Sequence, residues 1–140
     1  MKLFLCLIVL FASSAFSQTT VEIAAASDLD SLKTWKDLES WRLKYAPKYD
    51  DGFYAEGIAD FVERQLAENW QVFPLLISET SKSPELFNFV VSHIGEITTC
   101  TNAKIILGNA KHNCPLKLAV YCNKIYKKLK LNESSECVTV

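Results

Sequence analysis

Four of the five cysteines lie in the last third of the chain, and they limit its possible folds more than any other feature: Cys100, Cys114, Cys122 and Cys137. The chain opens with Met1 and Lys2, an apolar run over residues 3–12 and small residues that end at Ser17, a pattern typical of a secretory signal peptide. An export signal and an even number of remaining cysteines predict disulfides formed in an oxidising compartment. We therefore expect a secreted or periplasmic protein, cleaved near Ser17.

The spacing of apolar residues predicts an all-α protein. One helix is predicted from the capping sequence at Ser27 to Pro47, and the clearest amphipathic stripe runs from Tyr54 to Phe73. Further helices are predicted from Pro84, as the first helical residue, to a stop at Gly95, from about Thr98, and from Cys114 to about residue 131. We expect a compact bundle of five to six helices over 27–131, between a polar leader (18–26) and a C-terminal tail (132–140).

The cysteines are predicted to staple a C-terminal helical hairpin with two disulfides, and four cysteines can pair in three ways. If a helix begins at Cys114, that residue lies about 12 Å from Cys122, more than the roughly 7 Å that a disulfide allows. The predicted helix therefore excludes this pair. The favoured pairing is Cys100–Cys122 with Cys114–Cys137, and the alternative is Cys100–Cys114 with Cys122–Cys137.

Charge is unevenly distributed along a chain whose formal net charge is only −1. Residues 18–80 carry 12 acidic and 6 basic side chains, whereas residues 81–140 carry 4 acidic and 8 basic ones. Either the two halves complement each other when packed, or one of them presents a polar face to a partner. The near-neutral total argues against nucleic acid as a partner. No apolar run after the signal segment is long enough to cross a bilayer.

The segment from Asp50 to Gly57 is the most unusual in the chain and the place where we expect a binding site. It gathers the carboxylates of Asp50, Asp51 and Glu56 within a few residues of Gly57. A glycine inside a helix costs roughly 1 kcal/mol relative to alanine, so Gly57 indicates the close approach of another helix or of a ligand. Trp41 falls off the apolar stripe of its helix, which favours an exposed contact.

The sequence contains little evidence for a catalytic or metal-binding site. The familiar hydrolase, zinc-protease and phosphate-loop motifs are absent from the sequence. His93 and Glu96 lie three residues apart and could contribute two metal ligands, but a histidine held by a hydrogen bond is the favoured interpretation. No cofactor, metal site or catalytic residue is predicted.

One resemblance supports the picture of an exported helical protein. The order Tyr49-Asp50-Asp51-Gly52, Glu56-Gly57, Trp70, Pro74, His93 and Cys114-Pro115 followed by Cys122 resembles a group of small exported proteobacterial proteins of unknown function. The resemblance implies export and a helical fold, and it implies no activity. The chain departs from the group at Tyr49, where a cysteine is common, and in the additional Cys137, so the bridge pattern of the group does not transfer directly.

Three functions are compatible with these features. The leading hypothesis is a non-enzymatic exported protein, of the inhibitor or immunity type, that binds another macromolecule, most simply a protein. The second is a carrier that holds a small apolar ligand between its helices. The third is an enzyme with an acidic site near Asp50 and Glu56.

Overall fold

The computed structural model describes residues 19–95 and 98–132, and this part of the chain contains seven α-helices, two short 3-10 helices and no β-strand. The elements are α1 (Thr20–Asp30), α2 (Trp35–Tyr49), α3 (Gly52–Glu68), η1 (Trp70–Val72), α4 (Phe73–Thr80), α5 (Glu85–Ser92), α6 (Cys100–His112), η2 (Leu116–Leu118) and α7 (Ala119–Asn132). The all-α prediction is confirmed, with seven α-helices in place of five to six. The predicted signal peptide and residues 133–140 of the predicted tail lie outside the described residues.

The N-terminal helix begins earlier than predicted. α1 starts within the segment expected to be a polar leader because Thr19 and Glu22 form a capping box. The Thr19 hydroxyl accepts a hydrogen bond from the Glu22 backbone N–H at 3.2 Å, and the Glu22 carboxylate accepts one from the Thr19 N–H at 2.9 Å. This reciprocal pair satisfies two backbone donors that a helix start leaves without partners.

The single helix predicted from Ser27 to Pro47 is therefore two helices, α1 and α2. A second capping box, made by Thr34 and Asp37, starts α2 four residues after α1 ends. Pro47 does not end α2, which continues for two more residues to Tyr49. The sequence pattern failed here because the apolar spacing continues almost unbroken through the turn between the helices.

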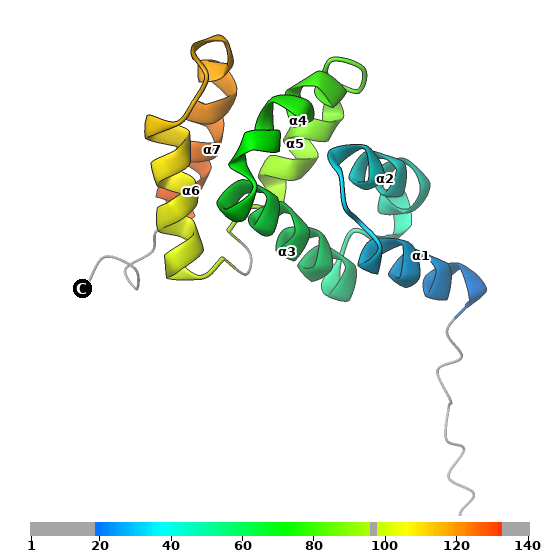
Figure 1. Ribbon diagram of the computed structural model, residues 1–140. Coiled ribbons are helices and arrows are strands. Elements are labelled where there is room, and N and C mark those ends of the chain that lie inside the picture. The colour runs from blue at the N-terminus through cyan, green and yellow to red at the C-terminus, as the bar shows by residue number, and fades with distance from the viewer. Residues whose placement is uncertain (1–18, 96–97, 133–140) are drawn as a thin grey trace, which may run out of the picture.

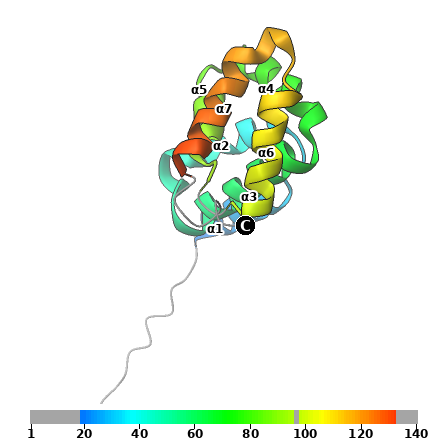
Figure 2. The same ribbon diagram turned by 90° about the vertical axis from the view of Figure 1, so that its left-hand side faces the viewer.

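α3 is the central element of the fold. It packs against α1 and α2 on one side and against α6 on the other. Figure 1 shows α3, α4 and α5 between the α1–α2 pair and the α6–α7 pair. Figure 2 shows α6 and α7 as an antiparallel pair across one side of the molecule. The largest fully buried side chains come from six α-helices, α2 to α7. They are Leu38, Ile58, Phe61, Leu66, Phe73, Leu76, Leu86, Ile106 and Ile125.

A buried carboxylate joins α3 to the start of α6. Glu63 is buried, and its carboxylate accepts hydrogen bonds from the Thr99 backbone N–H at 3.3 Å and from Asn102 Nδ2 at 2.7 Å. The N-terminus of a helix carries a partial positive charge, so a carboxylate at this position is stabilising. Glu63 therefore fixes the α6–α7 pair against the rest of the molecule.

The disulfide found among the described residues is the pair that the sequence argument excluded. Cys114 and Cys122 are bonded, with their Cα atoms 6.2 Å apart. Helical structure begins only at Leu116, because Pro115 has extended backbone angles and disfavours the helical conformation of the residue before it. Both predicted pairings are therefore wrong. Cys100 is also disulfide-bonded.

Gly57 marks a close approach of two helices, one of the two causes that the sequence indicated. A Cβ atom at Gly57 would lie 2.6 Å from Leu29 Cδ2 and 3.2 Å from Leu29 Cγ, on the facing side of α1. Leu29 is itself buried, so its side chain has little room to move away. The glycine is thus explained by the packing of α3 against α1.

We expect Gly57→Ala to lower the free energy of unfolding by about 1 kcal/mol, because overpacking against Leu29 outweighs the gain in helix propensity. In a Leu29→Ala background the clash is absent, so Gly57→Ala should raise the free energy of unfolding by about 1 kcal/mol. Urea unfolding of the four proteins, followed by circular dichroism, measures both differences. An effect of the same sign in both backgrounds would contradict this account of the glycine.

Candidate functional site

The predicted acidic segment contributes one residue to a buried polar contact. Asp50 follows the last residue of α2, and His93 follows the last residue of α5. The Asp50 Oδ1 atom lies 2.8 Å from His93 Nε2, while His93 Nδ1 lies 2.8 Å from the Phe89 carbonyl oxygen. The His93 side chain is 4% exposed and that of Asp50 is 39% exposed. The pair joins two helix ends that are 43 residues apart in sequence.

The geometry of this pair matches a structural role. A carbonyl and a carboxylate both accept hydrogen bonds, so each ring nitrogen of His93 faces an acceptor. Ser92 Oγ lies 3.3 Å from His93 Nδ1, which superficially resembles a serine–histidine–aspartate set. However, the Ser92 hydroxyl donates to the Phe89 carbonyl at 2.7 Å, and the same carbonyl faces Nδ1. Nδ1 is therefore not placed to accept the serine proton, as nucleophile activation requires.

The other residues of the predicted acidic site do not join this pair. Asp51 is the exposed N-cap residue of α3, and its side chain makes no capping hydrogen bond. Glu56 is exposed on the first turns of α3, and Gly57 faces Leu29. The histidine was favoured as a hydrogen-bonded residue, and that interpretation is confirmed. Its partner could not be identified because no local pattern connects residue 93 to residue 50.

Trp41 is not an exposed contact, and that prediction is wrong. Its side chain is 2% exposed, and its indole N–H donates to the Ala25 carbonyl oxygen at 2.9 Å. Helix α1, which begins seven residues before the predicted helix start at Ser27, covers it. The indole therefore packs between α1 and α2, and its one polar atom is satisfied inside the protein.

A partly buried ion pair within α2 also contacts the segment that precedes α5. Arg42 donates to both carboxylate oxygens of Glu39, at 2.7 and 2.9 Å, and to Ser83 Oγ at 3.1 Å. Burial raises the pKa of Glu39, but hydrogen bonds from Arg42 and Ser83 and the charge of Arg42 outweigh this effect, so the pKa lies below its ordinary value of 4.5. A carboxyl group with a lowered pKa in the folded state stabilises the fold when it is ionised.

We expect Glu39→Gln to lower the free energy of unfolding by about 1–2 kcal/mol at neutral pH. The pKa of Glu39 is lower folded than unfolded, so its contribution is complete above the ordinary value and is lost as pH falls through the folded-state pKa. Urea unfolding between pH 7 and pH 3 should show a shallower acid loss in the variant. Asp60→Asn, which removes an exposed pair with Arg64, is the control and should cost less than about 0.5 kcal/mol. Equal acid slopes in wild type and Glu39→Gln would contradict the assignment.

The α6–α7 pair carries charge of one sign only. We call residues 98–132 the basic hairpin: this segment contains seven lysines and no aspartate or glutamate. No described carboxylate lies within ion-pair distance of six of them: Lys104, Lys111, Lys117, Lys124, Lys127 and Lys128. The absence of acidic residues over the whole segment is the signal that could have identified this surface.

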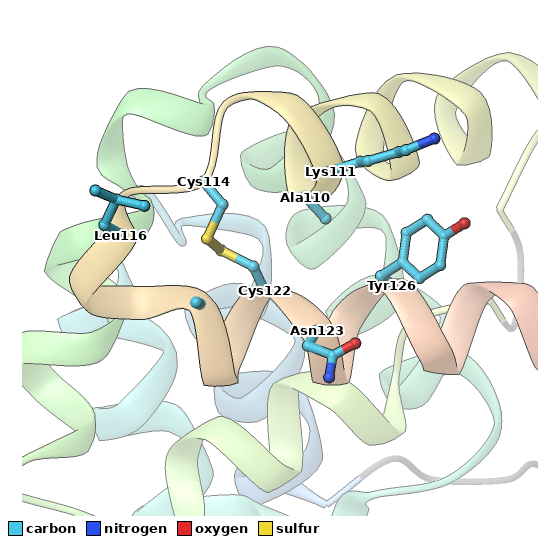
Figure 3. Close-up of a pocket in the computed structure, with 8 residues that line it drawn as sticks. Ala110, Lys111, Cys114, Leu116, Cys122, Asn123 and Tyr126 are labelled. Carbon is cyan, nitrogen blue, oxygen red and sulfur yellow. A yellow bond between two sulfur atoms is a disulfide. The ribbon is translucent and has the colours of Figure 1, made fainter.

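A surface hollow lies beside the disulfide of the basic hairpin. It has a volume of about 430 Å³, and Figure 3 shows it between the end of α6 and the start of α7. The residues that line it are Ala110, Lys111, Cys114, Leu116, Ala119, Cys122, Asn123 and Tyr126. Next to it, Leu116 is 95% exposed and Val120 is 70% exposed. Apolar surface and unpaired positive charge therefore occur together at this end of the molecule.

Comparisons of the chain with protein-family models, curated proteins and solved structures found no match. Within residues 19–95 and 98–132, no cluster of three or more histidine, cysteine, aspartate or glutamate side chains is arranged to hold a metal ion. The proposed ligand Glu96 lies outside the described residues. None of the described helices is both long and apolar enough to span a bilayer.

Proposed function

We propose that this chain is an exported, non-enzymatic protein that binds an acidic macromolecule, most simply a protein, through the basic hairpin. The observation that carries the proposal is the set of six lysines without a described carboxylate partner, on a segment that contains no acidic residue. Unpaired charges of one sign attract a partner of opposite charge and accelerate its association.

The rest of the molecule holds this surface in place. Glu63 anchors the start of α6, and Phe87 of α5 packs edge-to-face against Tyr121 of α7 at a centroid distance of 4.9 Å. The Cys114–Cys122 disulfide fixes the turn between the two helices. A binding surface on rigid elements loses little entropy when the partner docks.

The two alternative functions have less support. An acid–base enzyme needs titratable groups that can reach a substrate, whereas His93 is buried and its ring nitrogens face Asp50 and Phe89. A carrier needs space between its helices. Large side chains such as Phe61 and Phe73 are instead packed fully inside the bundle.

The test is capture of a partner from the compartment to which the protein is exported, at physiological ionic strength. Wild type is compared with Lys104→Gln/Lys117→Gln/Lys127→Gln, which removes three exposed charges from the basic hairpin. The matched control is Lys33→Gln/Lys36→Gln/Lys48→Gln, which removes three exposed charges near α2. We expect the hairpin variant to recover at least about ten-fold less of the specific partner, because each exposed ion pair contributes up to about 1 kcal/mol.

The control variant should capture as much partner as wild type does. Added salt should weaken capture by wild type and by the control variant alike. Failure of wild type to recover any specific macromolecule would refute the proposal. So would equal recovery by the hairpin variant and wild type.

A further inference from the structure

The hollow beside the disulfide has two chemically different ends. In Figure 3, Leu116 lies at one end, the Cys114–Cys122 disulfide lies near the middle, and Tyr126 lies at the other end. The Lys111 amine and the Tyr126 hydroxyl point in the same direction, away from Leu116. The hollow therefore runs from an apolar end to an end with a cation and a phenol.

We propose that this hollow seats one apolar side chain of the acidic protein partner, with a neighbouring partner carboxylate placed against Lys111. The inference rests on the proposed function and names the partner chemistry that the basic hairpin recognises: a bulky apolar residue flanked by aspartate or glutamate. A buried apolar anchor supplies affinity at the centre of an interface, and surrounding charges supply orientation and speed of association.

Charge and exposure decide between this occupant and others. No acidic side chain lies in residues 98–132, so the lysines of this segment would repel a cationic partner. Leu116 is 95% exposed, and covering it on binding adds apolar contact beyond the hollow itself. The volume of about 430 Å³ falls within the range of pockets that hold small molecules or single anchoring groups.

The direct test uses three short peptides and the disulfide-bonded protein labelled with nitrogen-15. The first peptide has one phenylalanine between two pairs of glutamates. The second replaces every glutamate by glutamine, and the third replaces the phenylalanine by serine. We expect the first to shift the amide resonances of Ala110, Lys111 and Asn123, and to bind at least ten-fold more tightly than either of the others.

Variants of the protein locate the site. Lys111→Gln should weaken binding of the first peptide about three- to five-fold, and Ala119→Trp, which fills the hollow, should abolish the shifts at Ala110. Leu116→Ser changes a side chain that is 95% exposed, so it preserves the fold and should weaken binding about three-fold. Lys36→Gln, on α2 and outside both the basic hairpin and the lining of the hollow, is the control and should leave the affinity within two-fold.

The outcomes separate this inference from the proposed function. Equal binding of the phenylalanine and serine peptides would overturn the anchor while leaving charge-dependent capture intact. Equal binding of the glutamate and glutamine peptides would overturn the role of Lys111. Unchanged binding by Ala119→Trp and Leu116→Ser, both still folded, would place the peptide elsewhere and overturn the inference.

Discussion

Replacing His93 by alanine is expected to lower the free energy of unfolding by about 3 kcal/mol. The ring is buried, and its removal leaves a cavity between the end of α5 and the α2–α3 connection. It also removes the hydrogen bonds at 2.8 Å to Asp50 and to the Phe89 carbonyl, which leaves that carbonyl with one fewer donor. Urea unfolding at neutral pH, followed by circular dichroism and tryptophan fluorescence, measures the loss.

Asp50→Ala should lower the free energy of unfolding by less, about 1–2 kcal/mol, because the Asp50 side chain is 39% exposed and water can take its place. Asp50→Ala/His93→Ala should lower the free energy of unfolding little more than His93→Ala alone does, since both single changes break the same contact. Asp51→Ala is the matched control. This neighbouring carboxylate is exposed and makes no capping hydrogen bond, so its removal should change stability by less than about 0.5 kcal/mol. Full additivity of the Asp50 and His93 variants would show that the contact contributes nothing to stability.

The contact between Asp50 and His93 also shows which features of the fold can be predicted from the sequence and which cannot. Helix starts and stops that depend on neighbouring residues were predictable: α5 begins directly after Pro84, and Gly95, with a positive φ of 92°, lies just past its end. Gly57 was correctly recognised as a position of close approach. The partners across these contacts, Leu29 and Asp50, depend on how the helices pack, and apolar spacing contains no information about that.

Two local errors had larger consequences. The apolar spacing hid the turn between α1 and α2, so Trp41 was assigned to the surface although α1 covers it. The last helix was predicted to begin at Cys114, whereas Pro115 is extended and delays the start of the helix. A shift of two to five residues at one helix start therefore reversed the disulfide prediction. Distances between cysteines are sensitive to backbone conformation in a way that the overall fold class is not.

The Cys114–Cys122 disulfide is expected to contribute about 2–3 kcal/mol to stability, as the chain-entropy relation gives for a loop closed by cysteines eight residues apart. Cys114→Ala/Cys122→Ala should lower the free energy of unfolding by this amount in urea. The same variant should also lose peptide binding at the hollow, because both cysteines line it. Lys36→Gln, an exposed position on α2 that leaves the disulfide intact, should change neither the stability nor the peptide binding.

The pairing itself can be tested with single variants and a thiol-specific label. With the observed bond, Cys122→Ala leaves a free thiol at Cys114, whereas the pairing favoured from the sequence would leave it at Cys100. Cys100 is itself disulfide-bonded. We expect peptide mapping of the unmodified protein to recover the pair 114–122. Label at Cys100 in the Cys122→Ala protein would refute the observed pairing, and with it the shape of the hollow.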